Sequence, residues 1–218
     1  MGFQDAQATW DARFSKADYH FGREPAVFLA AQQSLLADYL ATNPGASALA
    51  VSDGEGRNSV WLARQGLRVT AFDISPVGVA KAKKLAAEAG VSVDYRVEDI
   101  NAFDWDAAQY DVVAVIFIQY ASPPERARIF SGIQRALKPG GLAIIQGYGL
   151  RQLEYKTGGP GKADNLYSLD MMRTAFAALE PLLLAEHDAV VNEGPGHNGV
   201  SALVDFVGRR PGASTTTE

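Results

Sequence analysis

The sequence contains no cysteine, and it has only three histidines among its 218 residues. Without thiols the chain can form neither a disulfide nor a thiolate metal site, and a cysteine nucleophile is excluded. The histidines, His20, His187 and His197, are not spaced as a helical metal-binding pair, so we expect no metal site. Any chemistry must therefore come from other side chains or from an organic cofactor.

The sequence also lacks any apolar run of about eighteen residues. Its start, MGFQDAQATWDARF, lacks the basic-then-apolar order of a signal peptide. The net charge is -5 and the basic residues are scattered, whereas a nucleic-acid binder needs a basic stripe. The densest basic stretch, residues 81–84, is typical of the solvated face of a helix. We expect a cytoplasmic protein that binds neither nucleic acid nor a membrane, as a monomer or a homodimer.

What the sequence does contain is an alternation of strand-like and helix-like segments. The predicted strands of this part cover residues 47–52, 67–73, 91–97, 111–118 and 142–147. The predicted helices cover residues 24–40, 58–65, 76–89, 123–137 and 168–179. This alternation is typical of a parallel sheet with helices on both faces. Two further strand-like segments, 182–191 and 200–209, have no helix between them and predict a closing hairpin. The fold class is therefore α/β, with seven strands, one of them antiparallel.

The stretch AVSDGEGRNS, residues 50–59, joins the first predicted strand to a helix. Glycines in such a loop let backbone N–H groups approach a ligand at the positive end of the helix, which usually binds phosphate. Here Asp53 and Glu55 lie in the loop and would repel a pyrophosphate. We therefore expect a nucleoside ligand without phosphate, compatible with a positive charge.

Two further acids end the next two predicted strands. Asp73 follows Gly54 by nineteen residues and ends the second strand, where a carboxylate reaches the hydroxyls of a ribose. Asp99 ends the third strand and is placed to accept a hydrogen bond from an adenine amino group. A glycine turn or a helix-capping acid is ordinary in any α/β domain, but three such features in order indicate a nucleoside site.

These residues, together with WDARF (10–14), EGRN (55–58), LKPGG (137–141) and TGGP (157–160), resemble a known family. It is the class I S-adenosylmethionine-dependent methyltransferases, in the small-molecule branch near the tellurite-resistance and thiopurine methyltransferases. The resemblance covers nearly the whole chain and implies a Rossmann-like sheet of order 3-2-1-4-5-7-6 with strand 7 antiparallel. We expect a single methyltransferase domain over residues 1–210, with a lid and a helix in 1–42, and a disordered tail at 211–218.

The resemblance implies S-adenosyl-L-methionine as cofactor, S-adenosyl-L-homocysteine as product and a small-molecule acceptor. The implied cofactor-binding residues are Asp53, Gly54, Gly56, Asn58, Asp73, Ile74, Asp99, Ile100 and Gln119. The implied lid residues are Trp10, Phe14, Tyr19 and Phe21, and Tyr148 and Tyr155 are candidates to line the acceptor site. Ordinary apolar packing is as good an interpretation of these aromatic residues. The candidate catalytic residues are Tyr120, which follows the fourth strand, Arg151, which would attract an anionic acceptor, and His197, which would orient the acceptor or take its proton.

The sequence departs from the family pattern at Ala50 and Ser52, where the family often has an acid and a glycine. Either Asp53 supplies the missing charge from a shifted position or the cofactor binds more weakly. A catalytically silent nucleoside-binding module therefore stays open. A nicotinamide-dependent oxidoreductase is a second alternative, because residues 54–59 nearly fit the dinucleotide fingerprint. The acceptor itself is undetermined, with a thiol, a chalcogen oxyanion and a thiopurine-like compound as candidates.

Overall fold

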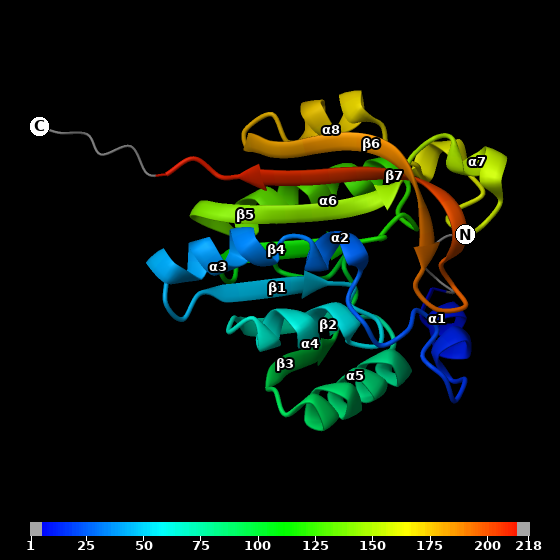
Figure 1. Cartoon of the computed structure of the whole chain (residues 1–218), viewed down its shortest axis with the longest axis horizontal. Coiled ribbons are helices and arrows are strands. Elements are labelled where there is room, and N and C mark those ends of the chain that lie inside the picture. Colours follow the sequence, from blue (N-terminus) through cyan, green and yellow to red (C-terminus); the bar gives the residue numbers. More distant parts are fainter. Residues whose placement is uncertain (1–5, 213–218) are drawn as a thin grey trace, which may run out of the picture.

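Seven strands form one sheet in the computed structural model, which describes residues 6–212 (Figure 1). Their order is β3-β2-β1-β4-β5-β7-β6. The strands are β1 (Ser47–Val51), β2 (Arg68–Asp73), β3 (Val93–Val97), β4 (Tyr110–Ile116), β5 (Leu137–Tyr148), β6 (Glu180–Asn192) and β7 (Asn198–Arg209). Strands β1 to β5 pair in parallel, and β7 is antiparallel to both of its neighbours. The predicted strand order and the antiparallel strand are confirmed.

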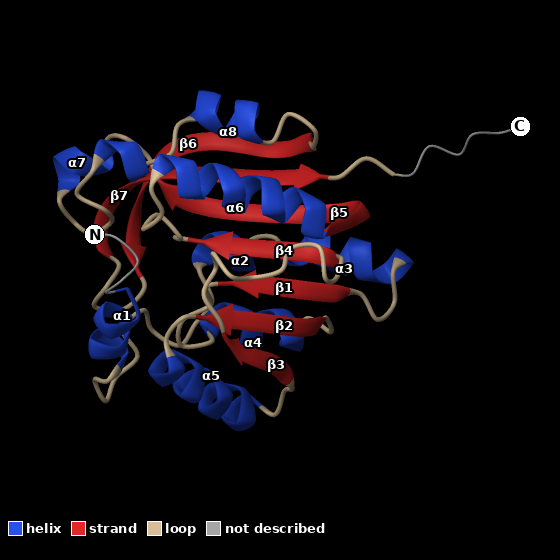
Figure 2. Ribbon diagram, turned by 180° about the vertical axis from the view of Figure 1, so that it is seen from behind, coloured by secondary structure: helices blue, strands red, loops and turns tan. Residues whose placement is uncertain are grey.

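Helices cover both faces of the sheet (Figures 1 and 2). The α-helices are α1 (Ala6–Phe14), α2 (Val27–Ala30), α3 (Gln33–Thr42), α4 (Arg57–Arg64), α5 (Pro76–Ala89), α6 (Pro123–Ala136), α7 (Gln152–Tyr155) and α8 (Leu169–Ala175). Side chains alternate along each strand, so Leu49 and Val51 join the core beneath α6 and α8. Ala48 and Ala50 join the opposite core beneath α2, α3 and α4.

Several local signals behave as predicted. The hydroxyl of Ser75 accepts a hydrogen bond from the backbone N–H of Gly78 at 3.0 Å and caps α5, which ends at Gly90 in the left-handed conformation (φ +68°). Ser122 and Glu125 form the capping box that begins α6. The closing hairpin is also present, with the N–H of Glu193 bonded to the carbonyl of His197 at 2.8 Å across its turn.

The helix predicted over residues 24–40 is wrong as one element, because it is broken into α2 and α3. Ala26 is still extended (ψ 133°), since its backbone N–H donates to the side chain of Asn58 at 3.0 Å. After α2 the N–H of Gln32 bonds to the carbonyl of Leu29 at 3.0 Å, one residue closer than in an α-helix. The side-chain amide of Gln32 donates a hydrogen bond to the carbonyl of Phe28, so this carbonyl is not paired with the backbone N–H of Gln32 as it would be in a continuous helix.

The carboxyl ends of the parallel strands meet at one edge of the sheet, and this edge positions the candidate site. The glycine loop follows β1, Asp73 ends β2, and residues 117–120 follow β4. Helix α1 and the loop of the β6–β7 hairpin lie at the same edge (Figure 1). The single-domain extent stays a prediction, and residues 213–218 of the predicted tail lie outside the described residues.

The structure over residues 6–212 also bears on membranes and metal ions. No helix in this range is both long enough and apolar enough to cross a membrane. In the same range, no three side chains of His, Asp or Glu gather as the ligands of a metal ion would.

Candidate functional site

Asp73 is a buried carboxylate at the end of β2, only 6% exposed. One oxygen accepts a hydrogen bond from the backbone N–H of Gly54 at 2.9 Å, and the other accepts one from the N–H of Ser75 at 2.9 Å. Burial raises the pKa of Asp73 to about 6, although the hydrogen bonds from Ser75 and Gly54 lower it. A carboxylate has about four lone-pair positions, so Asp73 can still accept further hydrogen bonds.

The two loop glycines are required by close packing. Gly56 begins α4 with φ +94°, and a Cβ atom there would lie 2.7 Å from the Cα of Ala82 on α5. Gly54 has φ +61°, and a Cβ atom there would lie 3.2 Å from the ring of Phe14. Only glycine lets the loop pass between α1 and α5 in this conformation.

Both loop acids have partners within the chain. Asp53 accepts hydrogen bonds from the backbone N–H of Ser59 at 3.1 Å and from its hydroxyl, and burial raises the pKa of Asp53 to about 7. Glu55 lies 2.5 Å from the ammonium of Lys81 and accepts a bond from the backbone N–H of His20 at 2.6 Å. Lys81 therefore offsets the charge of Glu55, and the expectation that the two loop acids disfavour a phosphate stays a prediction. The role of Asp53 toward a cofactor stays a prediction.

Two residues at the ends of neighbouring strands have strained backbones. Ser52 after β1 has φ +50°, and Phe117 after β4 has φ +57°. Left-handed conformations of residues other than glycine cost about 1 to 3 kcal/mol and concentrate at functional sites. The hydroxyl of Ser52 lies 2.5 Å from that of Tyr120, one of the candidate catalytic residues. Burial raises the pKa of Tyr120, so it remains a neutral phenol at physiological pH.

Helix α1 lies directly over the glycine loop. The ring of Phe14 is buried between Gly54 and Gly78, where an added Cβ atom at Gly78 would lie 2.8 Å from it. Asp11 accepts a hydrogen bond from the hydroxyl of Ser75, which begins α5. Three of the four predicted lid rings form one cluster with the site, with centroid distances of 5.4 Å for Trp10–Phe14, 6.2 Å for Trp10–Phe21 and 6.3 Å for Trp10–Tyr120. The fourth, Tyr19, instead donates a hydrogen bond to the carbonyl of Lys81 on α5. The helix is placed as a lid would be, and its closure over a cofactor stays a prediction.

Lys81 fixes the turn that follows α1. Its ammonium donates to the backbone carbonyls of Phe14 at 3.2 Å, Lys16 at 3.0 Å and Asp18 at 2.8 Å. The same ammonium pairs with Glu55 of the glycine loop. One side chain of α5 therefore joins the N-terminal segment to the loop beneath it.

His197 lies in the turn of the β6–β7 hairpin and is only 6% exposed, whereas its glycine-rich surroundings indicate an exposed histidine. Three aromatic rings surround it, with centroid distances of 4.3 Å to Phe117, 4.4 Å to Phe21 and 5.7 Å to Tyr148. Burial lowers the pKa of His197, and the carboxylate of Glu193, which lies 3.7 Å from Nδ1 and raises the pKa, does not cancel this effect. The imidazole is therefore neutral near pH 7 and is able to accept a proton.

A buried ion pair beside His197 was missed by the sequence analysis. The guanidinium Nη2 of Arg57 lies 2.8 Å from the carboxylate of Glu193, and each side chain is 7% exposed. The second oxygen of Glu193 accepts a bond from the backbone N–H of Val27 at 2.9 Å. The sequence did carry a signal for this pair: Arg57 and Glu193 each lie in a glycine-rich stretch. A charged side chain that is buried in such a stretch needs a partner of opposite charge.

Arg151 and Tyr155 lie apart from this group. The side chain of Arg151 is 55% exposed and pairs with Asp188 of β6 at 2.8 Å. The hydroxyl of Tyr155 accepts a bond from Arg151 at 2.6 Å and donates one to Asp188 at 2.8 Å. Of the candidate catalytic residues, Tyr120 and His197 belong to one aromatic cluster and Arg151 does not. The roles of Arg151 and Tyr155 toward an acceptor stay predictions.

Two of the implied cofactor-binding residues are engaged in backbone contacts. The amide of Gln119 donates to the carbonyl of Tyr148 at 2.8 Å and accepts from its N–H, so it joins the loop after β4 to the end of β5. The side-chain oxygen of Asn58 holds Ala26 ahead of α2. These contacts explain why both residues are buried, and their contacts with a cofactor stay predictions.

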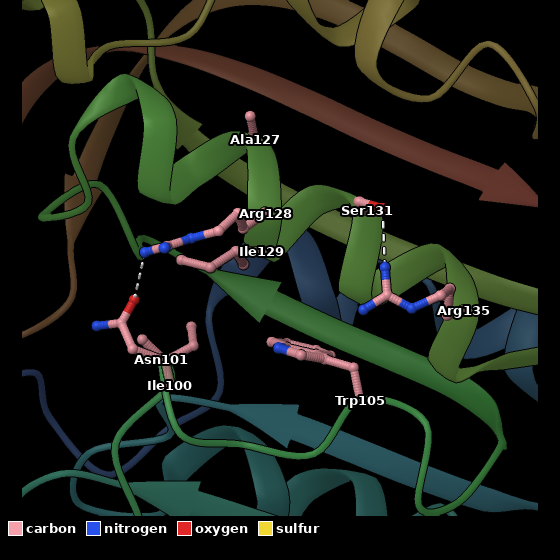
Figure 3. A pocket seen from close by; sticks show the side chains of 8 residues that line it. All are labelled: Ile100, Asn101, Trp105, Ala127, Arg128, Ile129, Ser131 and Arg135. Carbon is pink, nitrogen blue, oxygen red and sulfur yellow. Dashed lines mark hydrogen bonds between the residues drawn. The ribbon is translucent and has the colours of Figure 1, made fainter.

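The loop after β3 borders a pocket of about 500 Å³ (Figure 3). It is lined by Ile100, Asn101, Trp105, Ala127, Arg128, Ile129, Ser131 and Arg135. Asp99 accepts hydrogen bonds from the backbone N–H of Asn101 at 2.9 Å and from its amide at 3.2 Å, which shapes this loop. The two pocket arginines bond to Asn101 and Ser131. The pocket includes neither Asp73 nor the glycine loop, so it does not locate the nucleoside site.

The third histidine, His187, lies on β6 away from this group. Its ring lies 2.7 Å from the carboxylate of Asp205 on β7, whose other oxygen accepts a bond from Gln146 on β5 at 2.7 Å. This chain of contacts crosses three neighbouring strands.

Comparison with known proteins agrees with this geometry. Residues 48–141 match the family of the methyltransferase domain. A ubiquinone biosynthesis O-methyltransferase of Xylella fastidiosa (strain 9a5c) is 35% identical over 103 residues, which are 46% of this chain and 41% of that protein. One of the same description from Methylobacterium nodulans is 34% identical over 125 residues, 56% of this chain and 44% of that protein. The chain thus matches less than half the length of these curated relatives.

Solved structures are similar over most of the chain. One, from a study of the conversion of a disulfide bond into a thioacetal group during echinomycin biosynthesis, has a TM-score of 0.74 at 18% identity and covers 96% of this chain and 93% of its own. The N-methyltransferase NodS of Bradyrhizobium japonicum WM9, in complex with S-adenosyl-L-homocysteine, has a TM-score of 0.68 at 14% identity, with coverage of 95% and 100%. TehB of Haemophilus influenzae has a TM-score of 0.65 at 16% identity, with coverage of 81% and 62%.

The chain therefore has the fold of the class I S-adenosylmethionine-dependent methyltransferases, and its residues 48–141 match the methyltransferase domain family. The resemblance drawn from the sequence is confirmed, and TehB is among the structures with this fold.

Proposed function

We propose that the protein is an S-adenosylmethionine-dependent methyltransferase that acts on a small-molecule acceptor. The observation that supports this most directly is Asp73, a buried carboxylate that ends β2 and lies 2.9 Å from the N–H of Gly54 in the loop after β1. In an α/β sheet this edge, outside the carboxyl ends of the strands, is where nucleosides bind. When bound, the cofactor supplies a methyl group on a positively charged sulfur.

The residues present fit the nucleoside part of that cofactor. Asp73 has lone pairs left for two ribose hydroxyls, and its raised pKa reflects a desolvated carboxylate that gains from further donors. Gly54 and Gly56 give the loop a backbone that lies close to its neighbours. Phe14 and α1 would exclude water from the same place, which strengthens each polar contact.

The second half of the proposal concerns the acceptor side. Methyl transfer from sulfur is an in-line displacement that depends mainly on positioning, so few catalytic groups are required. We propose that Tyr120 and His197 orient the acceptor, and their fixed positions support this: Tyr120 is held by Ser52, and His197 is held among three rings. A thiolate or a chalcogen oxyanion needs no base, whereas a hydroxyl or amine does, and neutral His197 is then the group that takes the proton.

Binding is the first test. Calorimetry with S-adenosylmethionine, S-adenosyl-L-homocysteine and NAD should show heat with both sulfur nucleosides and none with NAD. Tight NAD binding with no heat from the sulfur nucleosides would overturn the proposal in favour of a nicotinamide-dependent oxidoreductase.

Turnover is the second test. Thiols, selenite, tellurite, thiopurines and small amines should be screened for formation of S-adenosyl-L-homocysteine, with His197→Gln and His187→Gln compared on the best acceptor. We expect His197→Gln to lower turnover without changing cofactor affinity, and His187→Gln to leave both unchanged. Cofactor binding with no turnover on any acceptor would support a silent nucleoside-binding module, for which the departures at Ala50 and Ser52 are the reason.

A further inference from the structure

The pocket between the loop after β3 and helix α6 has no part in the proposed chemistry. Its volume of about 500 Å³ falls within the range of about 300 to 1,000 Å³ that is typical of small-molecule sites. Its walls come from two segments that are distant in the sequence, residues 100–105 and residues 127–135 (Figure 3). A cavity of this size between two elements has room for an organic molecule of two fused rings.

The apolar part of the pocket wall is rigid. Ile100, Trp105 and Ile129 are each at most 8% exposed, so the surrounding core fixes their positions. The indole of Trp105 lies 4.9 Å from the ring of Phe103, and a Cβ atom at Gly132 of α6 would lie 2.5 Å from the indole. Glycine destabilises a helix interior relative to alanine, so helix stability is given up where the indole meets α6. A preformed apolar wall of this kind favours a flat apolar ligand.

The polar part of the wall offers hydrogen-bond donors. Figure 3 shows no hydrogen bond from the indole nitrogen of Trp105 to another residue that lines the pocket, although a buried indole N–H usually has a partner. Arg128 forms no ion pair within residues 6–212, and its hydrogen bond to Asn101 is long, 3.4 Å. Arg135, by contrast, is paired with Asp106 at 2.9 Å. Arg128 and the indole N–H are therefore the donors left for a ligand.

These groups together define the class of ligand. Over the described residues the pocket wall includes two arginines and no aspartate or glutamate. A guanidinium presents its donors in a planar fork that matches the two oxygens of a carboxylate. The indole and the isoleucine side chains match a planar apolar body. A small molecule that has both parts is an aromatic carboxylate.

We propose that this pocket is a binding site for a small aromatic carboxylate. Arg128 and the indole N–H of Trp105 donate hydrogen bonds to the carboxylate, and Ile100 and Ile129 pack against the rings. The site is separate from the nucleoside site at Asp73. A ligand held in this way joins α6 to the loop after β3.

The bound ligand should also stabilise that loop. The backbone N–H of Phe103 bonds to the carbonyl of Asp99 at 2.9 Å, and the carboxylate of Asp99 accepts a bond from the N–H of Asn101, so both contacts lie within the loop. The contact from α6 to Asn101 is the long bond from Arg128. Because Asp99 and Ile100 are predicted to hold adenine, a stabilised loop should raise the affinity for S-adenosyl-L-homocysteine. This coupling rests on the proposed function, and the binding of the carboxylate does not.

Calorimetric titration with 2-naphthoate, and with neutral 2-naphthamide as the matched compound, tests the site. Wild-type protein should bind the carboxylate about fivefold more tightly than the amide, because Arg128 is an exposed cation. Arg128→Gln should remove this difference. Arg173→Gln should preserve it, since Arg173 is a 60% exposed arginine on α8 that pairs with Asp170. Ala127→Trp places a ring in the pocket from the exposed side of α6 and should abolish the binding of both compounds.

The outcomes separate the pocket from the proposed function. Heat with S-adenosyl-L-homocysteine but none with 2-naphthoate overturns the pocket site and leaves the proposed function intact. Binding of 2-naphthoate without any binding of the nucleoside supports the site and contradicts the proposed function. Unchanged binding of 2-naphthoate by Ala127→Trp would also overturn the site.

The titration is repeated at saturating S-adenosyl-L-homocysteine. We expect the affinity for 2-naphthoate to rise about fivefold, because coupling between two ligands is reciprocal. Unchanged affinity overturns the coupling through the loop. Loss of 2-naphthoate binding would show that the compound occupies the nucleoside site, which overturns a separate site in this pocket.

Discussion

Arg57 and Glu193 form a buried ion pair, 2.8 Å long, between the first residue of α4 and the turn of the β6–β7 hairpin. Glu193 also holds the backbone of Val27 at the start of α2. The glycine loop, the N-terminal segment and the hairpin are therefore joined at one carboxylate. Since His197 lies beside the same carboxylate, the pair sets the position of a candidate catalytic residue relative to the glycine loop.

Breaking this pair should strongly destabilise the protein. We expect Glu193→Gln to lower the free energy of unfolding by about 3 to 5 kcal/mol, because the charge of Arg57 is left buried without its partner. Urea denaturation measures the change. The control is Glu154→Gln, since Glu154 is 67% exposed and lies 3.9 Å from Arg151, and such a pair contributes about 1 kcal/mol at most. Similar small losses in both variants would show that the Arg57–Glu193 pair contributes little.

The same carboxylate should produce a specific acid sensitivity. Burial by itself raises the pKa of Glu193, but its contact with His197 and the charge of Arg57 outweigh burial and lower the pKa from 4.5 to about 2. Because the folded state holds the proton more weakly than the unfolded state, the stabilisation is complete above pH 4.5 and is lost as the pH falls toward 2. Wild-type protein should lose about 3 kcal/mol more than Glu193→Gln across that range. Parallel acid-dependent denaturation curves for the two proteins would contradict this.

The backbone of Ser52 permits a clean comparison of two substitutions. Both Ser52→Gly and Ser52→Ala remove the hydrogen bond to Tyr120, but only glycine adopts φ +50° without strain. We expect the glycine variant to be more stable than the alanine variant by about 1 kcal/mol. At Ser131, within α6, the order should reverse by about the same amount, since alanine favours a helix. Thermal or urea unfolding of the four variants measures both differences. Equal stability of the two Ser52 variants would show that the backbone at residue 52 is not strained.

The fold was predictable because local signals and hydrophobic pattern agree along most of the chain. Ser75 and Gly90 bound one helix as expected, and two adjacent strand-like segments gave the hairpin. The failed element, residues 24–40, begins only after Ala26, whose backbone is held by Asn58, and it breaks at Gln32, where a tighter turn overrides a continuous apolar pattern. The spacing of hydrophobic residues carries no information on such hydrogen bonds.

The candidate site was predictable in part. The residues that were found are related by a short spacing along the chain, whereas those that were missed meet only through tertiary packing. Asp73 was found because its distance from Gly54 is fixed by the first strand–helix–strand unit. The partners of Glu55 and Glu193 were not found, because Lys81 and Arg57 reach them through tertiary packing. The burial of His197 has the same cause, since it depends on rings from the N-terminal segment and from β4 and β5.

Lys81 offers a test of the N-terminal segment. Lys81→Met should release the turn at residues 14–18, because the three carbonyls and Glu55 lose their shared cation. Hydrogen exchange should become faster there, and binding of S-adenosyl-L-homocysteine should weaken if the segment covers the cofactor. Lys84→Met, on the same helix with its side chain 74% exposed, should change neither. Faster exchange with unchanged affinity would separate the segment from cofactor binding.

Asp73 should affect stability and binding in opposite directions. Burial raises its pKa from 3.8 to about 6, so the folded state holds the proton more tightly than the unfolded state. Stability from this group is therefore full below pH 3.8 and is lost as the pH rises through 6. Relative to wild type, Asp73→Asn should gain up to about 3 kcal/mol of unfolding free energy between pH 3.8 and pH 8, offset in part by one lost hydrogen bond.

The same variant should bind S-adenosyl-L-homocysteine more weakly by about 1 to 3 kcal/mol at pH 8, since the ribose hydroxyls lose a charged acceptor. Asp111→Asn is the control. Asp111 accepts bonds from Ser47 and Lys138 that lower its pKa against the effect of burial, so neutralising it should reduce stability and leave affinity unchanged. Denaturation measures the change in stability of both variants, and calorimetry measures the change in their affinity for S-adenosyl-L-homocysteine. A folded Asp73→Asn protein with wild-type affinity would mean that Asp73 only anchors Gly54 and Ser75, because the loss of a charged ligand to the ribose could not leave binding unchanged.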